Sequence, residues 1–213
     1  MESTLSLQSN LYPKVTPAGA YYAVTSDTPS ASRTLLYSLL KASPTEVISS
    51  EKILAWADTS NIDTALNLLY RLQRLEFLYG DENVSNEEIH LTDEQLPSVL
   101  EQLSSSGKAL LADENGLYFA NANFHHEAAE ELGLLASEVT KMDSSHRLLI
   151  RNNLHINNNA WGICDPSGQS ELTFFPLYIG NTKLILVIGG MPDLNKEAFV
   201  TLVKVLYHRY GSR

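Results

Sequence analysis

The chain has 213 residues, of which 44% are hydrophobic and 19% charged, a composition that can support the core of one large domain or two small ones. Its net charge of −10 at pH 7 argues against a general affinity for nucleic acid, because phosphate binding draws on clustered Lys and Arg. No apolar run reaches the roughly 18 residues that a membrane-spanning helix needs. The single cysteine, Cys164, cannot form an internal disulfide, and the first residues show no signal peptide. Both observations favour a cytoplasmic location.

Residues 1–32 are rich in Ser, Thr, Pro and Ala and show no helical period. This composition predicts an extended arm or a flexible tail. Within it, Tyr21, Tyr22 and Val24 are apolar enough to dock on a neighbouring surface.

Residues 33–92 have a different texture, with three stretches of helical periodicity. They are "SRTLLYSLLKAS", "SSEKILAWAD" and the longer "SNIDTALNLLYRLQRLEFLYG", and a strand, a polar turn and a second short strand follow. Three helices followed by a two-stranded wing resemble a winged-helix domain. In that resemblance the third helix is the recognition helix, and its outward positions include Asn67, Arg71 and Arg74.

These three residues are the candidates for facing DNA. Arg71 and Arg74 are three positions apart and therefore share a face of the helix. However, the segment has more Asp and Glu than Lys and Arg. The same fold also serves as a protein-binding module or a rigid spacer, and the acidity favours that use.

Residues 93–213 alternate in period and predict the order α-β-β-α-β-β-β-α. The predicted fold class is therefore α+β, with a winged helix followed by a five-stranded, mostly antiparallel sheet covered by helices. Asp165–Gly168 has the residues of a type I turn, and Gly180-Asn181 is a two-residue hairpin signal. In the helix that begins at "FHHEAAEELGLLASEVTKM", the expected inward stripe is Ala128, Leu132, Leu135 and Val139, and we expect helix to about residue 150.

The oxygen-rich cluster Asp113, Glu114 and Asn115 stands before Gly116, between two of these strands. An isolated D-x-N-G lacks the distant bidentate Glu of a calcium loop. Asp and Asn favour turns by bonding their own backbone, and glycine supplies a positive φ. We therefore interpret the cluster as a turn. No other motif indicates a metal, a cofactor or a catalytic residue, since the phosphate-loop pattern fails at "SSSGKALL".

The order of elements, with "GKALLADENGLYFANANFHHEAAEELGLLASEV" at its start, resembles the Roadblock family of profilin-like domains over residues 93–213. The resemblance implies a non-enzymatic protein that dimerises through an edge strand and the helix after the first hairpin, often with a small Ras-like GTPase as partner. Here those elements are "AWGICD" and residues 126–140. The implied interface therefore lies around Trp161, Ile163, Glu130 and Glu138, although Trp161 also fits ordinary core packing.

Three functions stay open at this point. The first is a regulatory or scaffold protein that dimerises and binds a protein partner. The second is a transcription regulator in which the C-terminal half dimerises two winged helices on DNA. The third is a small-ligand sensor of the GAF type, because GAF domains have a similar order of elements. A deep pocket under the sheet would favour the third, and a filled interface between sheet and helix would count against it.

Overall fold

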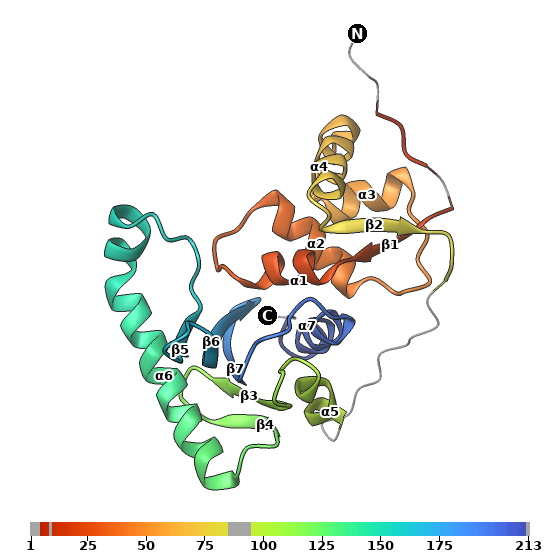
Figure 1. Cartoon of the computed structure of the whole chain (residues 1–213). Coiled ribbons are helices and arrows are strands. Elements are labelled where there is room, and N and C mark those ends of the chain that lie inside the picture. Colours follow the sequence, from red (N-terminus) through yellow and green to blue (C-terminus); the bar gives the residue numbers. More distant parts are fainter. Residues whose placement is uncertain (1–4, 9, 85–94, 212–213) are drawn as a thin grey trace.

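The computed structural model describes residues 5–8, 10–84 and 95–211. Its elements follow in chain order, with an antiparallel sheet at the centre of the C-terminal half (Figure 1). They are β1 (Tyr12–Val15), α1 (Pro17–Val24), α2 (Ala31–Lys41), α3 (Ser50–Trp56), α4 (Ile62–Arg74), β2 (Leu78–Asp81), α5 (Leu96–Glu101), β3 (Lys108–Asp113), β4 (Tyr118–Ala122), α6 (His126–Leu148), η2 (Leu149–Asn153), β5 (Trp161–Cys164), β6 (Ser170–Ile179), β7 (Thr182–Gly189) and α7 (Glu197–Tyr210).

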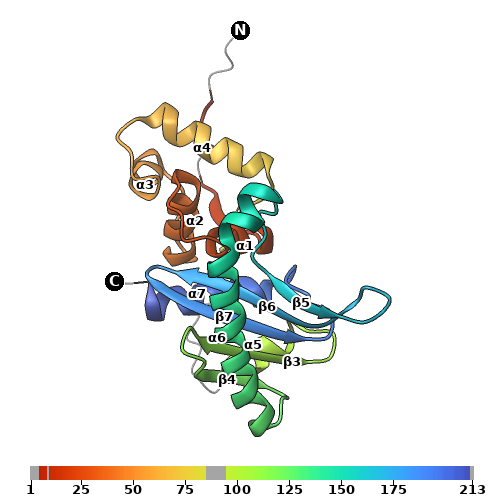
Figure 2. The same ribbon diagram turned by 90° about the vertical axis from the view of Figure 1, so that its left-hand side faces the viewer.

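The sheet of the C-terminal half has five strands in the order β4-β3-β7-β6-β5, and every neighbouring pair is antiparallel. Helix α6 crosses one face, and α5 and α7 lie against the other (Figure 1). The view in Figure 2 shows α6 running across the strands from the β4 side towards the N-terminal helices. The predicted five-stranded antiparallel sheet is confirmed.

The two turn signals mark the ends of strands as predicted. Gly180 and Asn181 join β6 to β7, and Ile179 pairs with Thr182 across them. Asp165 begins the turn between β5 and β6, where its carbonyl accepts a 2.9 Å hydrogen bond from Gly168 N. These local signals set the register of the sheet, because a turn of fixed length aligns the strands on either side.

Both faces of the central strands are buried, so the strands are apolar throughout. On one face Leu111 and Leu186 pack with α5, α7 and the N-terminal helices. On the other face Leu110 and Ile185 pack under α6. The inward positions expected for α7 are confirmed, because its predicted stripe is fully buried: Phe199, Leu202, Val203 and Leu206.

The predicted arm over residues 1–32 is wrong for residues 12–24, which form β1 and α1. Thr16 caps α1 by accepting a hydrogen bond from Gly19 N, and Pro17 occupies the first turn, where its missing N–H costs nothing. Hydrophobic periodicity did not indicate this helix, because its sequence "PAGAYYAV" has apolar residues on every side. As expected, Tyr21 docks on a neighbouring surface, with its ring 6.4 Å from that of Phe175 and 6.1 Å from that of Phe199.

The three helices expected in residues 33–80 are present as α2, α3 and α4. Strand β2 follows them, and it pairs with β1 from the start of the chain. The second strand of the predicted wing lies outside the described residues. A winged-helix arrangement therefore stays a prediction for this part of the chain.

The expected inward stripe of α6 is half confirmed, because Leu132 and Val139 pack against the cluster between helix and sheet. Ala128 and Leu135 are exposed, and the buried positions belong to small or polar residues: Ala129, Gly133, Ala136, Ser137, Thr140 and Asp143. Small side chains allow the helix to lie close to the sheet. The helix does continue to Leu148, as predicted, and ends in a wider turn over η2.

Within the described residues, none of the helices is long and apolar enough to cross a membrane.

Candidate interaction surface

The outward face of α6 carries large apolar side chains in contact with solvent. The inward face holds mostly small residues beside Leu132 and Val139, so several of the large apolar side chains are left on the outward face. Leu134 is 58% exposed and Leu148 is 76% exposed. We call the following residues the α6 patch: Leu134, Leu135, Met142, Leu148 and Leu149. A row of exposed apolar side chains along one helix is typical of a surface that another protein covers.

Strand β5 is an edge of the sheet next to α6. In the described part of the chain it pairs with β6 alone, so its other side offers backbone groups for a further strand. Ile163 and Cys164 on this strand are both exposed. Trp161 and Ile163 are two positions apart and share one face of the sheet, the face that α6 covers.

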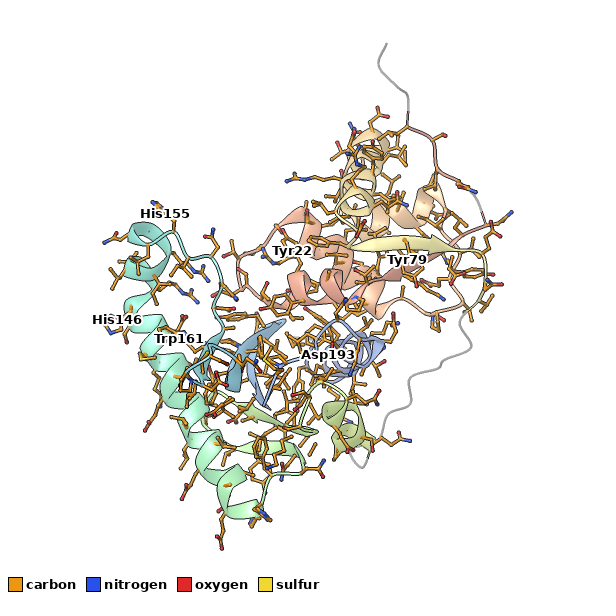
Figure 3. The ribbon with its side chains drawn as sticks, in the orientation of Figure 1. Tyr22, Tyr79, His146, His155, Trp161 and Asp193 are labelled. Atoms are coloured by element: carbon orange, nitrogen blue, oxygen red, sulfur yellow. The ribbon has the colours of Figure 1, made fainter. Side chains whose placement is uncertain are left out.

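The side chain of Trp161 packs against its own chain. Its indole Nε1 donates a 2.9 Å hydrogen bond to Asp143 Oδ1 on α6, and the residue is half-buried. Figure 3 labels Trp161 between α6 and the sheet. This contact supports the core-packing alternative for the ring itself. The role of Trp161 is then to hold β5 against the helix, while Ile163 stays outside.

A group of polar side chains lies between the C-terminal end of α6, the sheet and the loop after α1. Arg147 donates a 3.1 Å hydrogen bond to the Tyr178 hydroxyl and lies 3.5 Å from the Asp27 carboxylate. Burial, and then the charge of Arg147, lower the pKa of Lys183 on β7. Asn159 donates a 3.0 Å hydrogen bond to the Thr25 carbonyl. These contacts fix the end of the helix to the sheet and to the loop after α1.

Charge is distributed unevenly along α6 and the turn after it. The first half contains Glu127, Glu130 and Glu131. The second half and η2 contain both signs, with Lys141, Arg147 and Arg151 beside Glu138 and Asp143. Glu130 and Glu138, which the sequence placed at an interface, are both exposed on this helix. Glu130 lies 3.5 Å from His126 Nε2, one turn earlier.

The oxygen-rich cluster is a turn, as predicted. Asp113 Oδ1 accepts 2.9 Å hydrogen bonds from the backbone N–H groups of Asn115 and Leu117, and Gly116 has a φ of +91°. The turn also supports α6. A Cβ atom on Gly133 of that helix would meet Gly116 O at 2.3 Å, so helix and turn touch through two glycines.

The three candidates for DNA contact lie together on α4. Asn67, Arg71 and Arg74 are all exposed, at positions that share one face of the helix. Arg74 donates a 3.2 Å hydrogen bond to the Tyr70 hydroxyl. The Asn67 amide bonds the carbonyl of Asp63 in its own helix, at 2.8 Å.

The interface between α6 and the sheet is filled. Leu110, Ala112, Ile185 and Val187 are fully buried there against Ala129 and Ala136 of the helix. This packing counts against a ligand pocket under α6, which the sensor hypothesis needs. The α6 patch was missed from the sequence, because leucines at helical spacing were assigned to the core. The sequence feature that could have indicated the α6 patch is a second stripe, of Ala, Gly and Ser, on the other side of the helix.

Comparison with solved structures finds two chains of low similarity. A Roadblock/LC7 domain from Streptomyces avermitilis is 15% identical and has a TM-score of 0.35, covering 55% of this chain and 92% of that domain. MglB from Myxococcus xanthus is 14% identical and has a TM-score of 0.34, covering 61% of this chain and 92% of MglB. No family of proteins and no curated protein matches the sequence.

Proposed function

We propose that the chain is a cytoplasmic, non-enzymatic regulatory or scaffold protein that forms a homodimer and binds a protein partner. The observation that carries the proposal is the placement of the α6 patch beside the edge strand β5. An edge strand supplies directional backbone hydrogen bonds, and an adjacent apolar helix supplies burial. Together they can form an interface of the standard size for stable complexes.

A second copy of the chain fits this surface by symmetry. Two identical edge strands can pair antiparallel about a two-fold axis, which joins two five-stranded sheets into one. The same axis lays the two α6 helices antiparallel. Each apolar residue of one helix then faces the apolar patch of its copy, which satisfies the self-complementarity that a two-fold interface requires.

The charges on α6 support the antiparallel arrangement. The acidic first half of one helix, with Glu127 and Glu131, would lie beside the second half of the other, where Lys141 and Arg151 offset part of this charge. A parallel arrangement would bring the two acidic halves together. Opposite charges across an interface fix its register and speed association, even where they add little affinity.

The experiment measures molecular mass against protein concentration by analytical ultracentrifugation. We expect the chain to reach twice the 23.6 kDa of one copy. Ile163→Lys should shift the equilibrium towards the monomer, because a charge on the edge opposes strand pairing. Leu117→Lys is the matched control, since Leu117 is exposed beside β4 at the opposite edge of the sheet. A chain that stays monomeric at about 100 μM would contradict the proposal.

The proposed protein partner is a small Ras-like GTPase, which the Roadblock resemblance implies. A purified GTPase of this class from the same organism should bind the dimer with an affinity that differs between its GDP form and its form with a GTP analogue. If no such GTPase binds in either nucleotide form, the proposed partner is excluded. The proposed homodimer does not depend on this result.

Transcription regulation is the second candidate, and the shared face of Asn67, Arg71 and Arg74 on α4 favours it. It requires residues 33–92 to act as a winged helix. DNA binding should then weaken steeply with salt, and Arg71→Ala should lower the affinity across sequences. No retention of DNA at low salt would exclude this function.

A further inference from the structure

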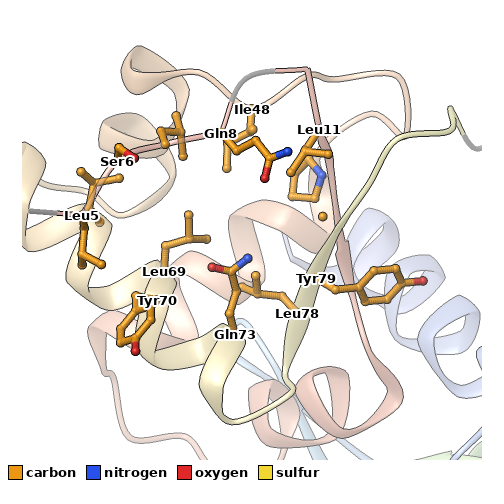
Figure 4. A pocket seen from close by; sticks show the side chains of 14 residues that line it. Leu5, Ser6, Gln8, Leu11, Ile48, Leu69, Tyr70, Gln73, Leu78 and Tyr79 are labelled. Carbon is orange, nitrogen blue, oxygen red and sulfur yellow. The ribbon is translucent and has the colours of Figure 1, made fainter. Parts of the chain in front are cut away.

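A cavity lies in the N-terminal half, far from β5 along the chain, between α4, β2 and the first described residues (Figure 4). Its volume is about 180 Å³. The space is partly open to solvent, so a small molecule can reach it from outside.

The floor of the cavity is aliphatic. Ile48, Leu69 and Leu78 line it and are buried, and they come from the loop before α3, from α4 and from β2. Leu66 of α4 and Leu11, which precedes β1, complete the walls. Water on this floor finds few hydrogen-bond partners, so its displacement by a small apolar group is favourable.

Two carboxamides stand at the rim. Figure 4 shows the side chains of Gln8 and Gln73 on opposite sides of the space, with Tyr70 and Tyr79 nearby. Among the described residues, neither Gln8 nor Gln73 has a hydrogen-bond partner for its side chain. Each carboxamide carries both a donor and an acceptor, so the rim can bind a hydroxyl, a carbonyl or an amide.

Among the described residues that line the cavity, none is Asp, Glu, Lys, Arg or His. A charged ligand would lose part of its hydration here without gaining a counter-charge, which opposes its binding. A neutral ligand avoids this cost. The volume is close to the roughly 150 Å³ of an engineered cavity that holds benzene, which sets the size at about one ring.

We propose that this cavity binds a small neutral molecule with an apolar body of about one ring and one hydrogen-bonding group. The apolar body would lie on Ile48, Leu69 and Leu78, and the polar group would reach Gln8 or Gln73. A molecule bound there contacts the first described residues and α4 at once. It would therefore tie the N-terminal segment to the helix.

The test uses three probes of the same shape and different charge: benzyl alcohol, benzoate and benzylamine. Each is titrated into the full-length chain while backbone amide signals are followed by NMR. We expect saturable shifts around Ile48, Leu69 and Leu78 with benzyl alcohol, and at least about tenfold weaker binding of the two charged probes. No saturable shift up to about 10 mM, or equal binding of all three, would overturn the proposal.

Two variants locate the site. Leu69→Phe adds volume to the floor and should abolish the shifts, with an unchanged far-ultraviolet circular dichroism spectrum as the check on folding. Gln73→Leu changes an exposed side chain and should leave the fold intact. Toluene, which has the ring without the hydroxyl group, should bind the wild-type chain more weakly than benzyl alcohol, and Gln73→Leu should remove much of this preference. Binding of benzyl alcohol that is unaffected by both variants would place it elsewhere and overturn the assignment.

Discussion

The indole N–H of Trp161 and the carboxylate of Asp143 meet at 2.9 Å, and this bond ties the edge strand β5 to the helix α6. Asp143 is 5% exposed, so the bond lies in a region of low dielectric constant. The two parts of the proposed interface are therefore held in one relative position before any partner arrives. Preorganisation of this kind lowers the entropic cost of association.

Replacing Asp143 by Ala should destabilise the chain. The indole N–H of the half-buried Trp161 would lose its acceptor, and a lost hydrogen bond costs about 1 kcal/mol. Asp143→Asn keeps an acceptor and should cost less. Urea unfolding measures both, and a double-mutant cycle with Trp161→Phe isolates the pair. Equal stability of the Ala and Asn variants would show that the bond contributes nothing.

Gly133→Ala should also destabilise the chain, although the same change inside a helix normally stabilises it by about 1 kcal/mol. The new Cβ atom would lie 2.3 Å from Gly116 O, so the helix or the turn must move. Overpacking of this kind costs about 1–3 kcal/mol. Urea unfolding measures the sign of the change in the free energy of unfolding. A gain in stability would mean that α6 does not pack against the turn.

Cys164 offers a direct probe of the β5 edge, because it is exposed and is the one cysteine of the chain. If β5 pairs with a second copy, the rate of thiol labelling should fall as protein concentration rises. The Ile163→Lys variant serves as the control, and its labelling rate should not depend on concentration. A wild-type rate that is equally constant would indicate that the strand stays uncovered.

The ion pair between Lys14 on β1 and Asp81 on β2 should make stability depend on pH. The hydrogen bond to Asp81 raises the pKa of Lys14 above 10.5, and the same bond lowers the pKa of Asp81 below 3.8. The contribution of Lys14 is present below pH 10.5 and is lost as pH rises through its raised pKa. The contribution of Asp81 is present above pH 3.8 and is lost as pH falls through its lowered pKa.

Lys14→Met should therefore lower the urea midpoint at pH 7 and have a much smaller effect at about pH 2, where Asp81 is protonated. Both side chains are partly exposed, so the effect at pH 7 is small and shrinks in high salt. Lys52→Met is the control, because its ion pair with Glu46 is longer, at 3.7 Å, and more exposed. An effect of Lys14→Met that is the same at both pH values would exclude the ion pair as its cause.

Local signals predicted the C-terminal half well. Gly180-Asn181 and the Asp113–Gly116 turn are short-range features whose conformations depend on their own residues, and the strands between them followed. The buried stripe of α7 was also predictable, since Phe199 and Leu202 repeat at helical spacing on a helix with one buried face.

Two features could not be predicted because they depend on tertiary packing. Helix α1 has little amphipathic pattern, and Ala20 and Val24 are buried because distant elements enclose them. On α6, hydrophobicity placed Leu135 in the core, but the contact between Gly133 and Gly116 turns the small residues inward. When a helix has one stripe of leucines and another of alanines, its sequence alone does not determine which stripe packs against the sheet.

The packing of α1 on α7 has a consequence for synthesis on the ribosome. The apolar surface of α1 is covered in part by a helix that is translated much later. Until α7 emerges, the ring of Tyr21 on α1 lacks Phe199, one of the two phenylalanine rings that it packs against. The N-terminal helices are thus expected to reach their native packing only after the C-terminal sheet and helix have been made, so that the first part of the chain to be synthesised is among the last to settle.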